Sequence, residues 1–191
     1  MKNSLHAGFL LALLAPGLAF AHIGAGEASG WAHGLFHPLL GADHLCAMIA
    51  VGLWAAQMGG RALWLTPLTF VGVMVLGGVL GMNAVPLPFI EGGILMSLLV
   101  LGGLIAAAIR LPLIASIALV GFFALFHGYA HGAEMPRSAS GLSYALGFML
   151  STASLHGIGI AMARVLAQKG RIDWLRLSGG IIALGGLCLV G

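Results

Sequence analysis

The chain has 191 residues, of which 60% are apolar and only 7% charged, whereas about a quarter of the residues of a soluble domain are charged. A soluble fold of this length has too little interior to cover so much apolar surface, so the composition predicts a protein embedded in lipid. The mean hydropathy of +1.08 agrees with this class. Eight Lys and Arg residues against five Asp and Glu residues form no basic face, which argues against a nucleic-acid partner.

The first residues have the pattern of a secretory signal peptide. Lys2 supplies a positive charge, an apolar stretch follows over 7–14, and Ala19 and Ala21 form a small-x-small cleavage site. We therefore expect a cleaved signal peptide at 1–21 and one membrane domain over 22–191. The alternative is an uncleaved first membrane helix, which is less favoured because the apolar stretch is short and is interrupted by Pro16.

The remaining chain divides into six apolar segments of about 18 to 23 residues, near the length that crosses a bilayer as a helix. Their continuous apolarity favours helices over the alternating pattern of a β-barrel. The sequence therefore predicts an all-α, polytopic membrane protein with a six-helix transmembrane bundle. Small residues such as Gly128, Gly132 and Ser154 predict close helix packing. The predicted spans are 38–58, 62–81, 90–109, 111–131, 141–163 and 174–190.

Basic residues are unevenly distributed between the predicted loops. If the signal peptide delivers residue 22 to the outside, six basic residues fall in the inner loops, and Arg137 is the basic residue of the outer loops. This distribution satisfies the positive-inside rule and places both termini of the mature protein outside. The inner residues are Arg61, Arg110, Arg164, Lys169, Arg171 and Arg176.

The first predicted span begins with a group of ionisable residues, which are costly inside a membrane and are therefore candidate functional residues. On a continuous helix, His33, His37 and His44 would lie within about 60° of one another. We expect Pro38 to open or kink this helix, because proline is favoured in a first turn. Asp43 would point about 120° away from His37, so it faces a neighbouring helix or is brought in by a local irregularity.

The fourth predicted span ends with a second group, in which His127, His131 and Glu134 share one helix face within about 40°. Neutral imidazole is a common ligand of divalent transition metals, and a carboxylate adds attraction for a cation. The predicted topology places both groups at the same membrane face, together with Glu91. A buried polar network that only fixes helix packing would also account for them.

Two further histidines lie outside these groups. His156 is about 15 residues into the fifth predicted span, some 22 Å along the helix, where it could be an inner relay or form an interhelical hydrogen bond. After cleavage, His22 would be the N-terminal residue. Together with His33 it would capture ions at the entrance, unless the terminus is disordered.

The strings HPLLGADH at 37–44 and FHGYAHGAE at 126–134 resemble the two signature motifs of the HupE/UreJ family of bacterial nickel and cobalt permeases. The resemblance covers the whole mature chain. It implies a multi-pass permease of the bacterial inner membrane, with periplasmic termini, that imports Ni²⁺ or Co²⁺ for enzymes such as hydrogenase or urease. The motif positions that carry this implied role over as metal ligands are His37, Asp43, His44, His127, His131 and Glu134.

Other functions are compatible with the same residues. A metal-dependent intramembrane hydrolase could use a His/Asp-bound zinc with an open position for water, although HExxH is missing from the sequence. A haem-carrying electron-transfer subunit could use paired histidines as axial ligands, although nearby carboxylates favour a bare cation. We expect no permanently bound cofactor and no enzymatic activity, with the metal ion as substrate. A homo-oligomer is compatible with the sequence, which specifies no stoichiometry.

Overall fold

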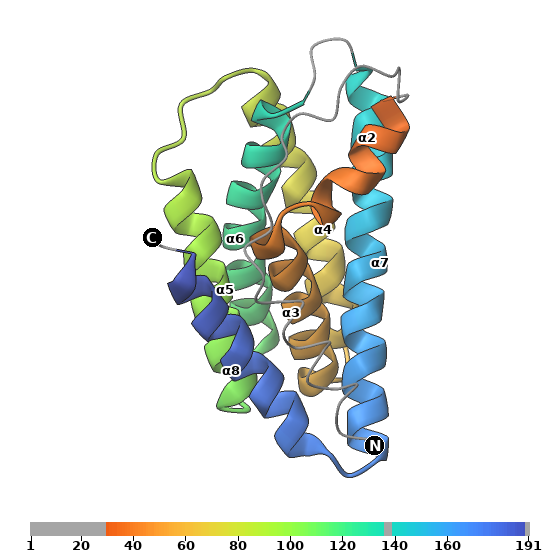
Figure 1. The fold of residues 1–191 in the computed structure, drawn as a ribbon, viewed down its shortest axis with the longest axis vertical. Helices are drawn as coiled ribbons and strands as arrows, with labels where there is room; N and C mark the ends of the chain where they lie inside the picture. The colour runs from red at the N-terminus through yellow and green to blue at the C-terminus, as the bar shows by residue number, and fades with distance from the viewer. Residues whose placement is uncertain (1–29, 136–138, 190–191) are drawn as a thin grey trace.

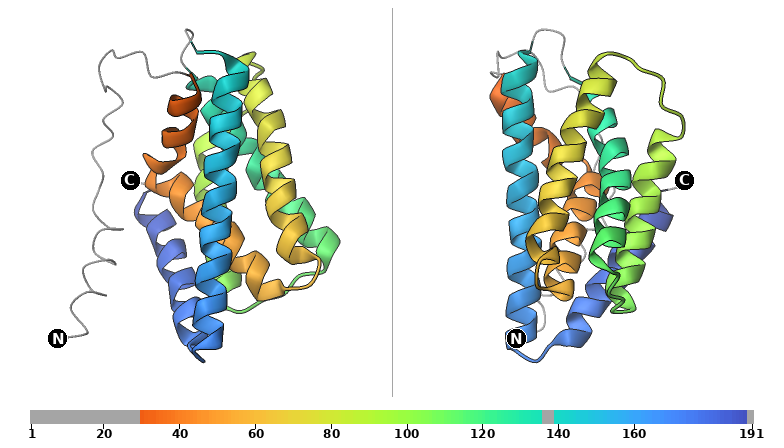
Figure 2. Two further views of the ribbon diagram at one scale, coloured as in Figure 1. Left: turned by 90° about the vertical axis from the view of Figure 1, so that its right-hand side faces the viewer. Right: turned by 180° about the vertical axis from the view of Figure 1, so that it is seen from behind.

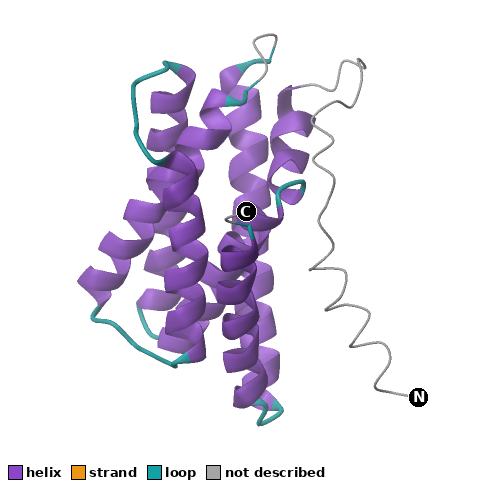
Figure 3. Ribbon diagram, turned by 60° about the vertical axis from the view of Figure 1, so that its left-hand side comes forward, coloured by secondary structure: helices purple, strands orange, loops and turns teal. Residues whose placement is uncertain are grey.

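The computed structural model describes residues 30–135 and 139–189, and every regular element in these ranges is a helix (Figures 1 and 3). The predicted all-α class is confirmed. The signal peptide expected at 1–21, His22 and Arg137 lie outside the described residues. The helices are α2 (Gly30–Phe36), the 3-10 helix η1 (His37–Leu39), α3 (Ala42–Met58), α4 (Ala62–Met82), α5 (Ile90–Ala106), α6 (Leu113–Ala133), α7 (Gly141–Gln168) and α8 (Ile172–Cys188).

Several of these helices are long and apolar enough to cross a membrane. In the described ranges α4, α6 and α7 meet this condition by themselves, and the bent pair formed by 30–39 and α3 makes a fourth if it counts as one span. Outward-facing side chains such as Leu68 and Leu76 are more than half exposed, as expected for helices that face lipid. The chain is a multi-pass membrane protein, and the count of six spans stays a prediction.

The first predicted span is broken, so the expected continuous helix over 38–58 is wrong. Helical structure begins upstream at Gly30, and the segment 30–39 meets α3 at an angle of 80°. Pro38 lies in the first turn of η1, where its missing N–H group is tolerated. Gly41, the residue before α3, has an extended backbone. The expectation that Pro38 opens or kinks the helix is therefore confirmed, and the bend follows it at 40–41.

The third predicted span ends earlier than expected, because Ala108 has a left-handed backbone (φ 56°) that stops α5 after Ala106. The fifth is longer than expected, since α7 continues to Gln168. The remaining predicted spans agree with their helices within about three residues.

Glycines let two pairs of helices pack at backbone contact, and Figure 2 shows α4 beside α6 and α3 beside α7. A Cβ atom on Gly128 would lie 2.0 Å from the carbonyl oxygen of Met74, and one on Gly52 would lie 2.1 Å from the carbonyl oxygen of His156. Small residues on the predicted packing faces therefore have the expected role at Gly128. The prediction is wrong at Ser154, which is exposed.

The two ends of the bundle differ in charge, although the acidic residue Asp173 lies at the basic end, in the first turn of α8. The basic residues of the described ranges lie where α4 and α8 begin and where α5 and α7 end, at the lower end in Figure 1. Glu134 follows α6 at the opposite end, and Glu91 is in the first turn of α5. This segregation fits the orientation that the positive-inside rule predicts. The basic residues are Arg61, Arg110, Arg164, Lys169, Arg171 and Arg176.

Candidate functional site

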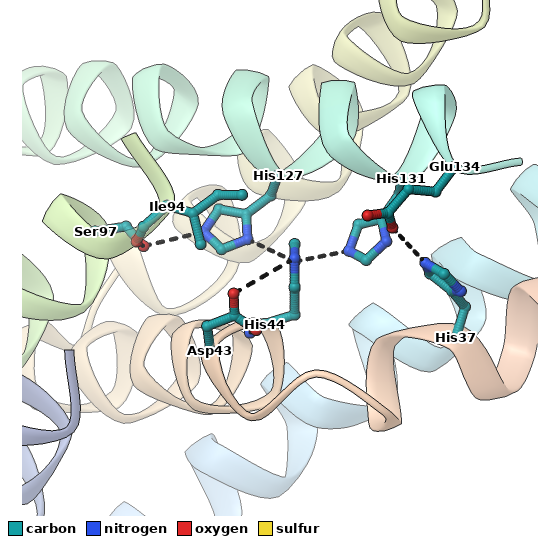
Figure 4. A network of polar contacts seen from close by, with 8 residues as sticks. All are labelled: His37, Asp43, His44, Ile94, Ser97, His127, His131 and Glu134. Atoms are coloured by element: carbon teal, nitrogen blue, oxygen red, sulfur yellow. Dashed lines mark hydrogen bonds and ion pairs between the residues drawn. The ribbon is translucent and has the colours of Figure 1, made fainter. Parts of the chain in front are cut away.

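The bend between η1 and α3 places the first-motif histidines on two differently directed helices. His37 lies on η1, before the bend, and His44 lies after it, in the first part of α3. They consequently do not form the single stripe that a continuous helix would give, although the rings of both contact His131 near the end of α6. His37 approaches Glu134, whereas His44 approaches the histidines one and two turns earlier (Figure 4).

Three buried imidazoles form a row between α3 and α6. Nδ1 of His44 lies 2.7 Å from Nε2 of His131 and 3.0 Å from Nδ1 of His127, with the ring of His44 between the other two (Figure 4). The three residues are 9%, 3% and 0% exposed, respectively. The expectation that the two motifs lie at the same end of the bundle is confirmed at the level of atomic contacts.

The outer end of this histidine row is partly open and carries a negative charge. Nε2 of His37 lies 2.9 Å from Oε2 of Glu134, and the glutamate side chain is 59% exposed. This hydrogen bond lowers the pKa of the Glu134 carboxyl, although partial burial opposes the effect. One ligand atom each from His37, His131 and Glu134 lies within 4.8 Å of the others, a spacing that could hold a metal ion.

Ser97 on α5 fixes the tautomer of the innermost histidine of the row. Its hydroxyl donates to the carbonyl oxygen of Ile94 at 2.6 Å, so that the hydroxyl oxygen accepts the hydrogen bond from Nε2 of His127 at 3.0 Å. A neutral imidazole carries one proton, so Nδ1 of His127 presents a lone pair to His44. Outer hydrogen bonds of this kind commonly orient metal-ligating histidines.

The middle of the row has more lone pairs than protons to pair with them. Nδ1 of His44 has either one proton or one lone pair, and it faces both the bare Nδ1 of His127 and Nε2 of His131. It can therefore form a good hydrogen bond with only one of them. Nδ1 of His131 is also buried, with no hydrogen-bond partner among the described residues. Unsatisfied imidazole nitrogens suit a divalent cation as the missing partner.

Asp43 lies beside the histidine row and is not part of the group formed by His37, His131 and Glu134. One carboxylate oxygen accepts a hydrogen bond from the backbone N–H of His44 at 2.8 Å, and the other lies 3.9 Å from its Nε2. The local irregularity that was one of two expectations for Asp43 is present, because the helix restarts at Ala42. Asp43 adds negative charge beside His44 and helps to orient it.

The candidate residues outside the two motifs lie at different depths in the bundle. His33 is exposed, with its ring 6.4 Å from that of His37, and Glu91 is exposed in the first turn of α5. His156 is buried on α7 and contacts Phe70, whose ring also contacts His127. The geometry brings Glu91 into no hydrogen bond or ion pair within the described ranges.

Sequence reasoning missed Ser97 and Phe70. The signal for Ser97 was its position as the one polar side chain within the apolar part of α5, after Glu91. Phe70 gave no signal, since aromatic residues are ordinary in membrane helices. Its place between two histidines depends on how α4, α6 and α7 pack.

A bundle of apolar helices that encloses a row of imidazoles, with a carboxylate at its open end, defines a polytopic membrane protein with a candidate cation site between its helices. The family described as HupE / UreJ protein matches residues 10–189. "Protein HupE" of Rhizobium leguminosarum bv. viciae is 41% identical over 190 residues, which cover 100% of this chain and 99% of the relative. No solved structure matches. The chain belongs to the HupE/UreJ family, which is a family of transporters rather than of enzymes.

Proposed function

We propose that this protein is an inner-membrane permease that imports Ni²⁺ or Co²⁺. Six spans, a cleaved signal peptide and periplasmic termini are part of the proposal, with the acidic end of the bundle on the periplasmic side. The single observation that carries it is the buried row of His127, His44 and His131, which leads inward from Glu134. Membership in a transporter family supports it, and disfavours a zinc-dependent hydrolase.

Capture of the ion begins at the open end. The carboxylate of Glu134 accepts the Nε2 hydrogen bond of His37, which leaves Nδ1 of that histidine to bind an ion. Asp43 and Glu91 add negative charge at the same end, and His22 and His33 are further candidates for the entrance. Carboxylate and imidazole together suit a divalent cation as it loses part of its water.

Passage then requires ligands that bind the ion without retaining it. The row beyond the open end is composed of neutral imidazoles, which suit Ni²⁺ but hold it less firmly than a closed set of thiolates would. Successive sites of moderate strength favour movement from one site to the next. Neighbouring nitrogens in the row are 2.7 and 3.0 Å apart, so an ion can contact the next imidazole before it leaves the last.

The experiment that tests this function is metal accumulation in bacterial cells that lack their own nickel and cobalt importers. At matched membrane levels, the wild type should accumulate Ni²⁺ or Co²⁺, and His44→Ala and His131→Ala should not. Tyr129→Phe, a buried polar change on α6 outside the row, is the matched control and should accumulate the ion normally. No accumulation by well-inserted wild type would contradict the proposal, as would normal accumulation by both histidine variants.

A further inference from the structure

His156 is a buried imidazole with no hydrogen-bond partner in the described part of the chain. It is 2% exposed, and neither Nδ1 nor Nε2 is paired with any described residue. An interhelical hydrogen bond, which was one interpretation of this histidine, is therefore not present in the described part of the chain. Burial of unpaired polar groups is unfavourable, so two unpaired nitrogens on one ring indicate a partner that is a ligand rather than a side chain.

The side chains around His156 also offer lone pairs. Thr152 lies one turn before it on the same face of α7, and its Oγ1 is 3.4 Å from Sδ of Met48 and 3.7 Å from Sδ of Met74. These three side chains are at most 2% exposed. The thioethers come from α3 and α4, so three helices bring an oxygen and two sulfurs together in a buried region one helical turn from His156.

A single aromatic ring connects this region to the histidine row. The ring of Phe70 lies 5.6 Å from that of His127 and 5.2 Å from that of His156, measured between centroids. Phe70 and Met74 are one turn apart on α4, as His156 and Thr152 are on α7, so the two helices contact each other at two successive levels. Met74 and Thr152 lie one turn nearer the acidic end than Phe70 and His156, and Gly128, next to His127, packs against the backbone of Met74. The group of Met48, Met74 and Thr152 therefore lies beside the inner part of the row, and His156 lies deeper.

We propose that His156, Thr152, Met48 and Met74 form a second, inner site for the transported divalent cation, which begins beside His127 and extends to His156 toward the basic end. This inference rests on the proposed function, because the ion must first enter through the row. The inner site has an imidazole and two thioethers, which suit borderline and soft metals, and no carboxylate. It therefore binds the ion more weakly than the group of His37, His131 and Glu134 at the open end does, as release toward the basic end requires.

The first test is uptake by variants at the inner site. His156→Gln should lower Ni²⁺ or Co²⁺ uptake by about tenfold or more at matched membrane levels, as loss of a metal-site residue commonly does. Ser154→Ala, an exposed polar change two residues away on the same helix, should leave uptake unchanged. Wild-type uptake by His156→Gln, with uptake still lost in His131→Ala, would overturn the inner site and leave the proposed function intact. No uptake by the wild type would overturn both.

The second test distinguishes contact with the ion from a structural role. In purified protein whose Cys46 and Cys188 are replaced by alanine, His156→Cys places a thiolate at the inner site. Added Co²⁺ should then give a near-ultraviolet thiolate-to-metal charge-transfer band, and Ser154→Cys, on the exposed face, should give none. If His156→Cys folds as a monodisperse protein but gives no band, the ion does not reach this residue and the inference is wrong.

Discussion

Removal of the negative charge at Glu134 should weaken capture of the ion and leave the fold intact. Glu134→Gln has nearly the same shape, and its amide oxygen can still accept the hydrogen bond from His37 at 2.9 Å. Two unit charges 4 Å apart attract by about 1 kcal/mol in bulk water, so a divalent ion at this distance is stabilised by about 2 kcal/mol. Each 1.36 kcal/mol corresponds to about a factor of ten, so we expect uptake at low ion concentration to fall at least roughly 30-fold.

The assay is the initial rate of Ni²⁺ uptake at concentrations well below half-saturation, in cells with matched membrane levels. Asp173→Asn removes the same charge from the first turn of α8, at the basic end, and is the control that should transport normally. Because the Glu134 side chain is more than half exposed, salt screens its charge, and the effect of Glu134→Gln should be smaller at high ionic strength. Uptake by Glu134→Gln within about twofold of the wild type would refute electrostatic capture at this carboxylate.

Three further results are expected. Ser97→Ala should lower uptake about tenfold at a normal membrane level, because Nε2 of His127 loses the partner that fixes its tautomer; normal uptake would contradict that role. Gly128→Ala should lower the melting temperature of the purified protein, corresponding to about 1–3 kcal/mol, whereas Gly157→Ala, which has open space, should not; equal melting temperatures would contradict the packing. His33→Ala should reduce uptake less than threefold, roughly, as expected for an exposed entrance residue; complete loss would place it in the site.

Much of the fold could be predicted because apolar length is a local property. A segment that must cross lipid is visible in a window of about 20 residues, and α4 begins and α7 begins at the predicted residues, Ala62 and Gly141. The bend after Pro38 was expected in kind but not in size. Its angle of 80° depends on where α2 and η1 pack against α7 and α3, which is a tertiary property.

The candidate site was partly predictable for the same reason. Helical spacing places His127 and His131 on one face of α6, and the predicted topology brings His44 to the same end. The contacts between them depend on the break at 40–41, which changes the direction of the chain between His37 and His44. The pairing of Ser97 with His127 joins two residues 30 positions apart on different helices, and no sequence spacing specifies such a contact.

The most direct test of the central claim is transport by the purified chain alone. Proteoliposomes that enclose a fluorescent Ni²⁺ or Co²⁺ indicator should respond to external ion when they contain the wild type, and His44→Ala at equal density should reduce the initial rate to that of empty liposomes. His44 is the residue to test because its Nδ1 contacts both other imidazoles of the row. A wild-type rate in His44→Ala proteoliposomes would show that the ion does not pass through the row, and a wild-type response equal to that of empty liposomes would contradict transport by this chain.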